Sequence, residues 1–176
     1  AAPGNKTSHL SMIMENTGTI YAFDMDKKRL ETLERLTERA GCTNIIPTNG
    51  SFLDINPKDG KFRDVEYILL DPSCSGSGIV GRMDHLTKDI EGATNEQEVL
   101  ETEENRIESL AEFQKSVLLH AFTFPNVKKV VYSTCSKHEQ ENELVVQHVL
   151  QNSTNWRLSK DVFTQWSRRG VEVIKG

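Results

Sequence analysis

Two cysteines stand just beyond apolar segments that are typical of β-strands. Cys74 lies in DPSCSGSG (71–78), which follows YILL, and Cys135 lies in YSTCS (132–136), which follows a run of valines. A cysteine thiolate is a strong nucleophile, so these positions indicate covalent chemistry at one or both sulfurs. The alternative for either cysteine alone is a small buried hydrophobic residue, the commonest role of a free thiol. The polar, glycine-rich neighbours of Cys74 favour a site over a core position.

The residues that follow Cys135 predict the start of a helix. Ser136 and Glu139 have the S-x-x-E spacing of a capping box, which predicts a helix from Ser136 to about Gln151. A helix N-terminus lowers the pKa of an adjacent thiol and would make Cys135 a better nucleophile. His138 raises two alternatives, a metal half-site and a cysteine hydrolase. The sequence shows neither a second ligand pair for a metal nor a residue that would orient a histidine base.

Strand-like and helical segments alternate along the chain and predict the fold. The segments rich in β-formers are 18–24, 43–48, 65–71 and 127–133. The segments with helical periodicity are 26–41, 106–122 and 136–151. The nearly continuous apolar strands indicate burial on both faces, so we expect an α/β fold with a mostly parallel sheet and helices on both sides.

Ligands of such sheets gather beyond the carboxyl ends of the strands. Four side chains should therefore converge on one side of the sheet, namely Asp24, Asp71, Cys74 and Cys135. The predicted site therefore lies at this side of the sheet, with both thiols in it.

The first residues, AAPGNKTS (1–8), form a second candidate site. They lack the Gly-Lys-Ser/Thr run and the upstream glycine of a phosphate-binding loop, so a nucleoside triphosphatase is disfavoured. They predict either an ordinary loop or a turn whose Gly4 lets the backbone approach a nucleoside closely. Asp24, at the end of the next strand, is where related folds bind ribose hydroxyls. Its alternative role is to cap the following helix, a role that Asp26 could also fill.

Composition sets the remaining limits. The 176 residues suit one domain, and 36% hydrophobic and 27% charged residues are ordinary for a soluble protein. Three cysteines, an odd number, argue against a secreted disulfide framework and favour a reducing intracellular compartment; Cys42 is assigned to packing. No apolar segment reaches membrane-spanning length. Nine acidic and two basic residues lie between Asp84 and Glu108, so the net charge of −5 comes from that stretch and the remainder is +2.

We therefore expect one catalytic domain over residues 1–176 with an acidic insertion at about 82–105. Because no strand precedes AAPGNKTS and the tail ends in what resembles a partial strand, we expect the domain to be incomplete at both ends.

Five short motifs together resemble the NSUN/RsmB family of S-adenosylmethionine-dependent RNA cytosine-5 methyltransferases. They are AAPGNKT, YAFD, LLDPSCSGSG, VVYSTCS and EQENE, and they span the chain from Ala1 to about residue 150. The pairing of Asp-Pro-x-Cys-Ser-Gly with Ser-Thr-Cys-Ser is the most specific part. The complete set of motifs is most similar to that of the family member that acts on large-subunit ribosomal RNA. The resemblance implies a Rossmann-like class I methyltransferase fold, S-adenosylmethionine as cofactor, ribosomal RNA as partner, no metal, no membrane, and a nuclear, nucleolar location.

The resemblance also implies residue roles. Cys135 matches the nucleophile that attacks carbon-6 of the cytosine, Cys74 the second cysteine that helps release the methylated product, and Asp71 the carboxylate beside the cytosine edge and cofactor. With these roles, the two cysteines would flank a flipped pyrimidine base across a gap of its own size, and such a base must first leave its stack. The cofactor-binding positions are Ala1, Ala2, Pro3, Gly4, Asn5, Lys6, Asp24, Arg29 and Asp71.

The sequence departs from the family pattern at several positions, so some of the family's ligand contacts have no clear match here. The Asp-Ala-Cys that begins the first motif is absent, and the acidic residue after the third strand aligns near Ser51, with Asp54 close but shifted. Candidate phosphate contacts are Lys128, Lys129, Arg168 and Arg169. Two alternatives remain: a methyltransferase of the same fold that acts on a protein or small molecule, and a non-catalytic domain in ribosome assembly.

Overall fold

The computed structural model describes residues 1–79 and 96–159 of the chain. These residues divide into two compact units, Ala1–Asn56 and Pro57 onward, and each unit is described by itself. Residues 82–95 of the predicted acidic insertion lie outside the described residues. The candidate phosphate contacts Arg168 and Arg169 also lie outside them.

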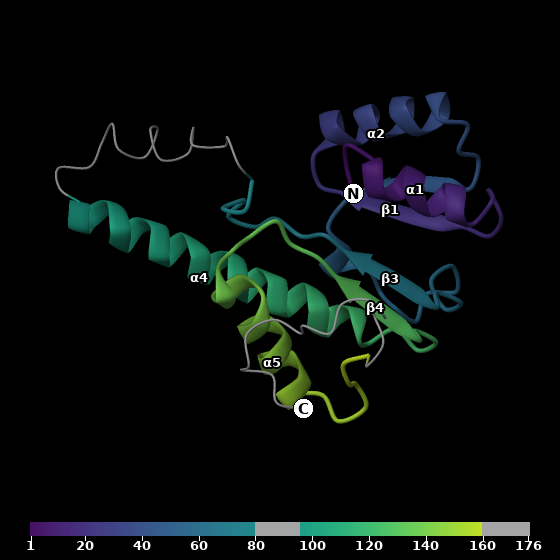
Figure 1. The fold of residues 1–176 in the computed structure, drawn as a ribbon. Coiled ribbons are helices and arrows are strands. Elements are labelled where there is room, and N and C mark those ends of the chain that lie inside the picture. Colours follow the sequence, from purple (N-terminus) through teal and green to yellow (C-terminus); the bar gives the residue numbers. More distant parts are fainter. Residues whose placement is uncertain (80–95, 160–176) are drawn as a thin grey trace. The chain divides into compact units, whose positions relative to one another are not determined.

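The first unit is built on a parallel strand pair. Strands β1 (Ile20–Asp24) and β2 (Ile45–Asn49) are joined by helix α2 (Lys27–Arg39), and helix α1 (Asn5–Ile13) precedes them (Figure 1). A short 3₁₀ helix η1 (Phe52–Asp54) follows β2. Both strands and α2 agree with the sequence prediction within two or three residues.

Apolar side chains from three elements form the core of this unit. Leu33 of α2 is fully buried against Ala2 and Ala22, with Ile45 partly buried beside them. Leu30 and Leu33 recur at helical spacing, which explains why α2 turns this face toward β1 and β2. The N-cap of α2 is Asp26, whose Oδ1 accepts a hydrogen bond from the Arg29 backbone N–H at 3.0 Å.

The second unit repeats the strand–helix–strand plan. Strands β3 (Tyr67–Leu70) and β4 (Lys129–Tyr132) pair in parallel, with Leu70 opposite Tyr132, and helix α4 (Glu96–Ala121) connects them (Figure 1). A 3₁₀ helix η2 (Glu139–Glu141) leads into helix α5 (Glu143–Gln151). The buried face of this unit comes mainly from α4 and α5, through Ile107, Ala111, Val117, Leu118, Ala121, Val145 and Val149. Parallel strands linked by helices confirm the predicted α/β class.

Two helix boundaries differ from the prediction. Helix α4 begins at Glu96 rather than 106, so residues 96–105 of the predicted insertion are helical. Helix α5 begins at Glu143 rather than Ser136. The capping box does not form because the Ser136 hydroxyl accepts from the His138 N–H, two residues on, which closes a local turn instead of a helix end.

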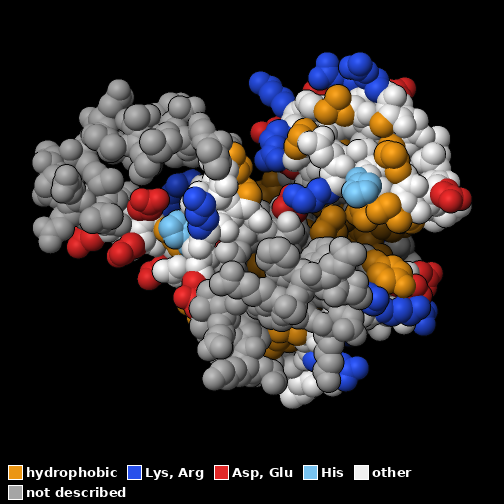
Figure 2. Space-filling model, viewed as in Figure 1, with side chains coloured by type: hydrophobic (Ala, Val, Ile, Leu, Met, Phe, Trp, Pro, Cys, Tyr) orange, Lys and Arg blue, Asp and Glu red, His pale blue; other side chains and the backbone are white. Residues whose placement is uncertain are grey.

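Charge is unevenly distributed over the described surface. Figure 2 shows Lys and Arg side chains gathered over α2 and acidic side chains along α4. Lys128, a candidate phosphate contact, forms an ion pair with Glu66. Among helices within residues 1–79 and 96–159, none is both long and apolar enough to cross a membrane.

Candidate functional site

The sulfurs of Cys74 and Cys135 are in contact. Cys74 Sγ lies 3.2 Å from Cys135 Sγ, although 61 residues separate them in the sequence. Each cysteine belongs to the loop that follows β3 or β4, and because these strands are parallel their carboxyl ends lie at one edge of the pair. Asp71 starts the first of these loops, and the Ser133 hydroxyl at the start of the second donates to its Oδ1 at 3.4 Å. The structure thus brings Asp71, Cys74 and Cys135 together, as predicted, whereas Asp24 belongs to the other unit.

The predicted gap between the thiols is absent. Both cysteines are free, and 3.2 Å exceeds the roughly 2.05 Å of a covalent S–S bond. A flat ring between the two sulfurs would need van der Waals contact on both faces, a separation of about 7 Å. Cys135 is exposed and Cys74 partly exposed. A base must therefore approach both sulfurs from the solvent side or move them apart.

The environment of Cys135 also differs from the prediction. With α5 starting at Glu143, no helix N-terminus adjoins this thiol. Its hydrogen bond with Cys74, partial burial and the charge of Cys74 raise the pKa of Cys135 above its ordinary value. The resting sulfur is therefore held in its protonated form by its partner, and loss of the proton must accompany nucleophilic use.

Replacing Cys74 with alanine is expected to lower the pKa of Cys135, because the substitution removes both the hydrogen bond and the neighbouring charge that raise it. The thiolate is the form that reacts with iodoacetamide, so the midpoint of alkylation against pH should move to lower pH in the variant. Peptide mass spectrometry, with Cys42 as internal reference, measures this midpoint. An unchanged or more alkaline midpoint would contradict the assigned cause.

The two cysteine loops also meet through their backbones. The Gly78 N–H donates to the Cys135 carbonyl at 2.9 Å, and a Cβ at position 78 would lie 2.8 Å from that same oxygen. Such a distance is too short for a carbon–oxygen contact, so only glycine permits this approach. The Lys137 N–H adds a second tie by donating to Ser77 Oγ at 2.9 Å.

Substitution of Gly78 by alanine should lower the free energy of unfolding by about 1–3 kcal/mol, because the loop must shift or lose its hydrogen bond to Cys135. Urea unfolding measures this change. Gly60→Ala is the matched control, because a Cβ there meets nothing within 4 Å, and its effect should stay within about 0.5 kcal/mol. Equal effects of the two substitutions would show that the close approach is unimportant.

In the first unit, Asp24 organises the N-terminal turn. Its Oδ2 accepts from the Ala2 N–H at 3.0 Å, and its Oδ1 accepts from the Asp26 N–H at 3.0 Å. Arg29 donates to the Ala2 carbonyl at 2.7 Å. Burial acts to raise the pKa of Asp24, but the hydrogen bonds from the Ala2 and Asp26 N–H groups lower it, and the net pKa is lowered. The carboxylate is therefore ionised at neutral pH.

The rest of this turn packs closely on α2. Gly4 has φ of 108°, a left-handed conformation that favours glycine, and it forms the N-cap of α1. A Cβ at Gly4 would lie 3.2 Å from Leu33 Cγ and 3.3 Å from Thr37 Cγ2. Asn5 and Lys6 are exposed in the first turn of α1. Ala2, Asp24 and Arg29 thus contact one another, and Gly4 lies two residues after Ala2 in the same turn. That these residues share a ligand stays a prediction.

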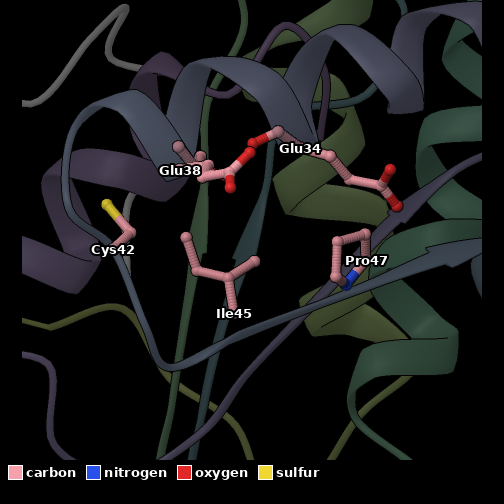
Figure 3. A pocket seen from close by; sticks show the side chains of 6 residues that line it. Glu34, Glu38, Cys42, Ile45 and Pro47 are labelled. Atoms are coloured by element: carbon pink, nitrogen blue, oxygen red, sulfur yellow. The ribbon is translucent and has the colours of Figure 1, made fainter.

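The residue near the expected acidic position has a local structural role. Ser51 caps η1 by accepting from the Leu53 N–H at 3.1 Å, and Asp54 is an exposed residue of the same short helix. A hollow is present elsewhere in the unit. A shallow hollow of about 300 Å³ between α2 and β2 is lined by Glu34, Thr37, Glu38, Cys42, Ile45 and Pro47 (Figure 3). It contains none of the predicted site residues, and its two carboxylates disfavour an anionic ligand.

Four residues of the second unit that had no predicted role at the site hydrogen-bond to the cysteine loops or to one another. They are Gln114, Tyr132, Glu141 and Asn142. Tyr132 lies in the YSTCS motif and Glu141 and Asn142 lie in EQENE, whereas Gln114 lies in none of the quoted motifs. The sequence does carry a signal for Gln114. It is a polar residue on the otherwise apolar face of its helix, between Ala111 and Val117, which indicates a buried hydrogen-bonding role. Within the described residues, no three His, Cys, Asp or Glu side chains gather as a metal would need.

Comparison with known sequences identifies the family. The family described as "16S rRNA methyltransferase RsmB/F" matches residues 1–174. The "25S rRNA (cytosine-C(5))-methyltransferase NSUN5" of Arabidopsis thaliana is 45% identical over 179 residues, covering 100% of this chain and 31% of the relative. The "28S rRNA (cytosine-C(5))-methyltransferase" of Mus musculus is 43% identical over 177 residues, covering 100% of this chain and 36% of the relative. The chain thus spans about a third of the length of these relatives.

Solved structures support the same fold. A crystal structure of a methyltransferase homologue from Pyrococcus horikoshii matches with a TM-score of 0.59 and 35% identity, over 86% of this chain and 43% of that one. The structure of NSun6 from Pyrococcus horikoshii with SFG matches with a TM-score of 0.63 and 27% identity, over 86% of this chain and 35% of that one. The methyltransferase fold predicted from the motifs is confirmed over most of the chain. On the match of residues 1–174, this chain belongs to the RsmB/F family of ribosomal RNA methyltransferases.

Proposed function

We propose that the protein transfers a methyl group from S-adenosylmethionine to carbon-5 of a cytosine in large-subunit ribosomal RNA, through a covalent adduct on Cys135. The observation that carries this proposal is the contact of two free thiols, 3.2 Å apart, at the carboxyl edge of the β3–β4 pair, with Asp71 at the start of the same loop as Cys74. Relatives at 43–45% identity, named as cytosine-C(5) methyltransferases of 25S and 28S rRNA, support the substrate class. A nucleolar location follows from such a substrate and is part of the proposal.

The chemistry needs a nucleophile because carbon-5 of cytosine is unreactive by itself. Cys135, once its Sγ has lost its proton, attacks carbon-6 and forms an S–C bond, and the displaced double-bond electrons make carbon-5 nucleophilic. Asp71 accepts or donates a hydrogen bond at the base edge and stabilises the charge that develops on the ring. Carbon-5 takes the methyl group, then loses its proton to a base. The same electron pair re-forms the ring double bond and expels Cys135 Sγ as a thiolate.

The contact between the two sulfurs supports a role for Cys74 in the last step. Its sulfur touches that of Cys135, so it can exchange a proton with the departing thiolate and keep it from attacking again. General acid–base assistance of this kind is worth about 10²–10⁴-fold in rate.

The first unit fits the cofactor. S-adenosylmethionine, when bound, supplies the methyl group. Asp24 is ionised and can accept further hydrogen bonds from hydroxyl groups such as those of a ribose, since a carboxylate offers about four acceptor positions. Gly4 allows close approach of the backbone, and the predicted residues Ala1, Ala2, Pro3, Asn5, Lys6 and Arg29 surround the same turn or continue from it. We infer that this cluster holds the cofactor.

Asp24→Ala should weaken S-adenosylmethionine binding by about 10–100-fold, because hydrogen bonds to a charged acceptor are worth about 1.5–3 kcal/mol. Calorimetric titration of the intact protein measures the affinity. Asp26→Ala is the control: it removes the N-cap of α2 at a stability cost of about 1 kcal/mol but should leave the affinity unchanged. Equal losses of affinity would show that Asp24 acts only through the local fold.

The test of the proposed function is to map 5-methylcytosine in large-subunit ribosomal RNA from cells with and without the protein. Purified intact protein and S-adenosylmethionine should then restore the missing methyl group in vitro. Restoration that fails while cofactor binding is intact would favour a protein or small-molecule substrate. An unaltered methylation map with no cofactor binding would favour a role in assembly, and either result would overturn the proposal.

A further inference from the structure

A fully buried carboxylate lies behind the cysteine pair. Glu141 has no solvent exposure, and its Oε1 accepts hydrogen bonds from the Ser75 N–H and from Gln114 Nε2, both at 2.9 Å. Burial acts to raise its pKa, but hydrogen bonds from Ser136, Ser75 and Gln114 outweigh it, and the net pKa is lowered. These donors are all neutral. A buried polar group is costly without hydrogen bonds, so these contacts tie Glu141 firmly to its donors.

The contacts of Glu141 and Gln114 bracket Cys74. Gln114 Nε2 also donates to the Ser73 carbonyl at 3.0 Å, while Glu141 holds the Ser75 N–H. The backbone groups immediately before and after Cys74 are therefore fixed by two side chains that hydrogen-bond to each other. Gln114 is itself fully buried in α4, so this bracket is anchored in the core of the second unit.

The next residue, Asn142, brackets Cys135 in the same way. Its Oδ1 accepts from the Thr134 hydroxyl, and its Nδ2 donates to the Ser136 carbonyl at 3.0 Å. Asn142 occupies the N-cap position of α5, yet its side chain makes no capping hydrogen bond. An asparagine at an N-cap ordinarily caps the helix. Here that role is given up, and both ends of the amide bond the residues on either side of Cys135.

Tyr132 connects the two brackets. Its hydroxyl lies 2.6 Å from the Glu141 carbonyl oxygen and 3.0 Å from Gln114 Oε1, and its single proton is shared between them. Burial raises the pKa of Tyr132, so the hydroxyl remains a donor at any physiological pH. Tyr132 is also the last residue of β4, so the strand that precedes the Cys135 loop is tied to the network that holds the Cys74 loop.

We propose that Glu141 and Asn142, consecutive residues of the EQENE segment, are positioning residues that hold the two sulfurs in contact. Glu141 acts on Cys74 together with Gln114, and Asn142 acts on Cys135. The inference deepens the proposed function and rests on it for the catalytic role of the pair. The geometric part, that these two side chains set the distance between the sulfurs, is independent of any RNA and can be tested alone.

The first experiment measures how readily the two sulfurs join. Diamide, an azo oxidant, takes two electrons and two protons from Cys74 and Cys135, so that a disulfide forms and the azo bond becomes a hydrazine. Formation is followed in the intact protein as a loss of 2 Da in the linked peptides. Glu141→Ala and Asn142→Ala should each slow it by about tenfold or more, because misplacement by about 1 Å has effects of that order or larger.

Two further variants separate positioning from stability. Glu141→Gln keeps an oxygen that accepts from Ser75 and Gln114, so it should retain most of the wild-type rate. Val149→Ala removes buried volume from α5 without touching either bracket and should destabilise the unit with little change in rate. If Glu141→Ala keeps the wild-type rate, or slows no more than Val149→Ala, the proposal is overturned. Asn142→Ala, a partly buried position, keeps the test decisive if Glu141→Ala does not fold.

The second experiment links each bracket to its own step. With large-subunit ribosomal RNA and S-adenosylmethionine, Glu141→Ala should accumulate the protein–RNA adduct, whereas Asn142→Ala should form it slowly. A loss of stability alone would lower both steps together in both variants, and that outcome would overturn the assignment. Failure of the wild type to form any adduct would count against the proposed function, while the diamide rates would still decide the positioning role.

Discussion

Cys135→Ala is expected to abolish methyl transfer to ribosomal RNA and to prevent any covalent protein–RNA adduct. The loss should be about 10⁴-fold or more, because removal of a nucleophile eliminates the covalent route and the remaining groups cannot replace it. RNA that contains 5-azacytidine gives the clearest readout. Its ring has nitrogen at position 5, so no proton is available for the release step, and an adduct, once formed, persists through denaturing electrophoresis.

The control for this experiment is Cys42→Ala. Cys42 is a free cysteine of the first unit that lines the hollow between α2 and β2. It has no role in the proposed reaction, so its substitution should leave trapping unchanged. Trapping by Cys135→Ala at the wild-type level would remove the proposed nucleophile. Trapping that requires Cys74 instead would reverse the roles of the two thiols.

Cys74→Ala is expected to lower turnover by about 10²–10⁴-fold while leaving adduct formation intact. The physical reason is the 3.2 Å contact: Cys74 is the group placed to exchange a proton with the sulfur of Cys135 as the latter leaves the base. Ordinary RNA, without 5-azacytidine, is the informative substrate here. The variant should accumulate an adduct that the wild type resolves, and burst kinetics should show one rapid event followed by slow turnover.

Cys74→Ser serves as the matched comparison, since a hydroxyl retains a weaker donor and acceptor at the same place. Its turnover should fall between those of the wild type and Cys74→Ala. If Cys74→Ala turns over at the wild-type rate, the second sulfur has no part in release, and its contact with Cys135 concerns only the resting state.

The sequence alone predicts where the strands end and therefore that the two cysteines lie close together. The apolar segments before Asp24, Asp71 and Ser133 predict strands, and the rule that parallel strands end at a common edge predicts that Asp71, Cys74 and Cys135 lie together. That rule depends on backbone direction alone, which explains its success. The distance between the sulfurs depends on side-chain and loop contacts, so the pattern could not show that the expected gap is closed.

The error at Ser136 has a physical cause. The capping-box spacing describes one local preference, but the Ser136 hydroxyl accepts from the His138 N–H and closes a turn instead, and Glu141 and Asn142 are held by other contacts. Glu141 bonds Ser75 and Gln114, which are 66 and 27 residues away, and Asn142 bonds the Cys135 loop instead of capping α5. Local propensity contributes about 1 kcal/mol at a cap, less than a network of buried hydrogen bonds can supply. The early start of α4 was missed because the residues from Glu96 onward are too polar to show an apolar stripe.

The division of the site residues between two units has a practical consequence. Both sulfurs, and every side chain that brackets them, belong to the part of the chain from Pro57 onward, whereas Asp24 and Arg29 belong to Ala1–Asn56. In the proposed function, bond formation to a pyrimidine is thus assigned to the second stretch of polypeptide, and capture of the methyl donor to the first stretch together with Asp71 of the second. A substitution that abolishes adduct formation should leave cofactor binding intact, and the reverse should also hold. Mixing one variant of each kind and measuring methyl transfer therefore tests whether a single molecule must carry both activities.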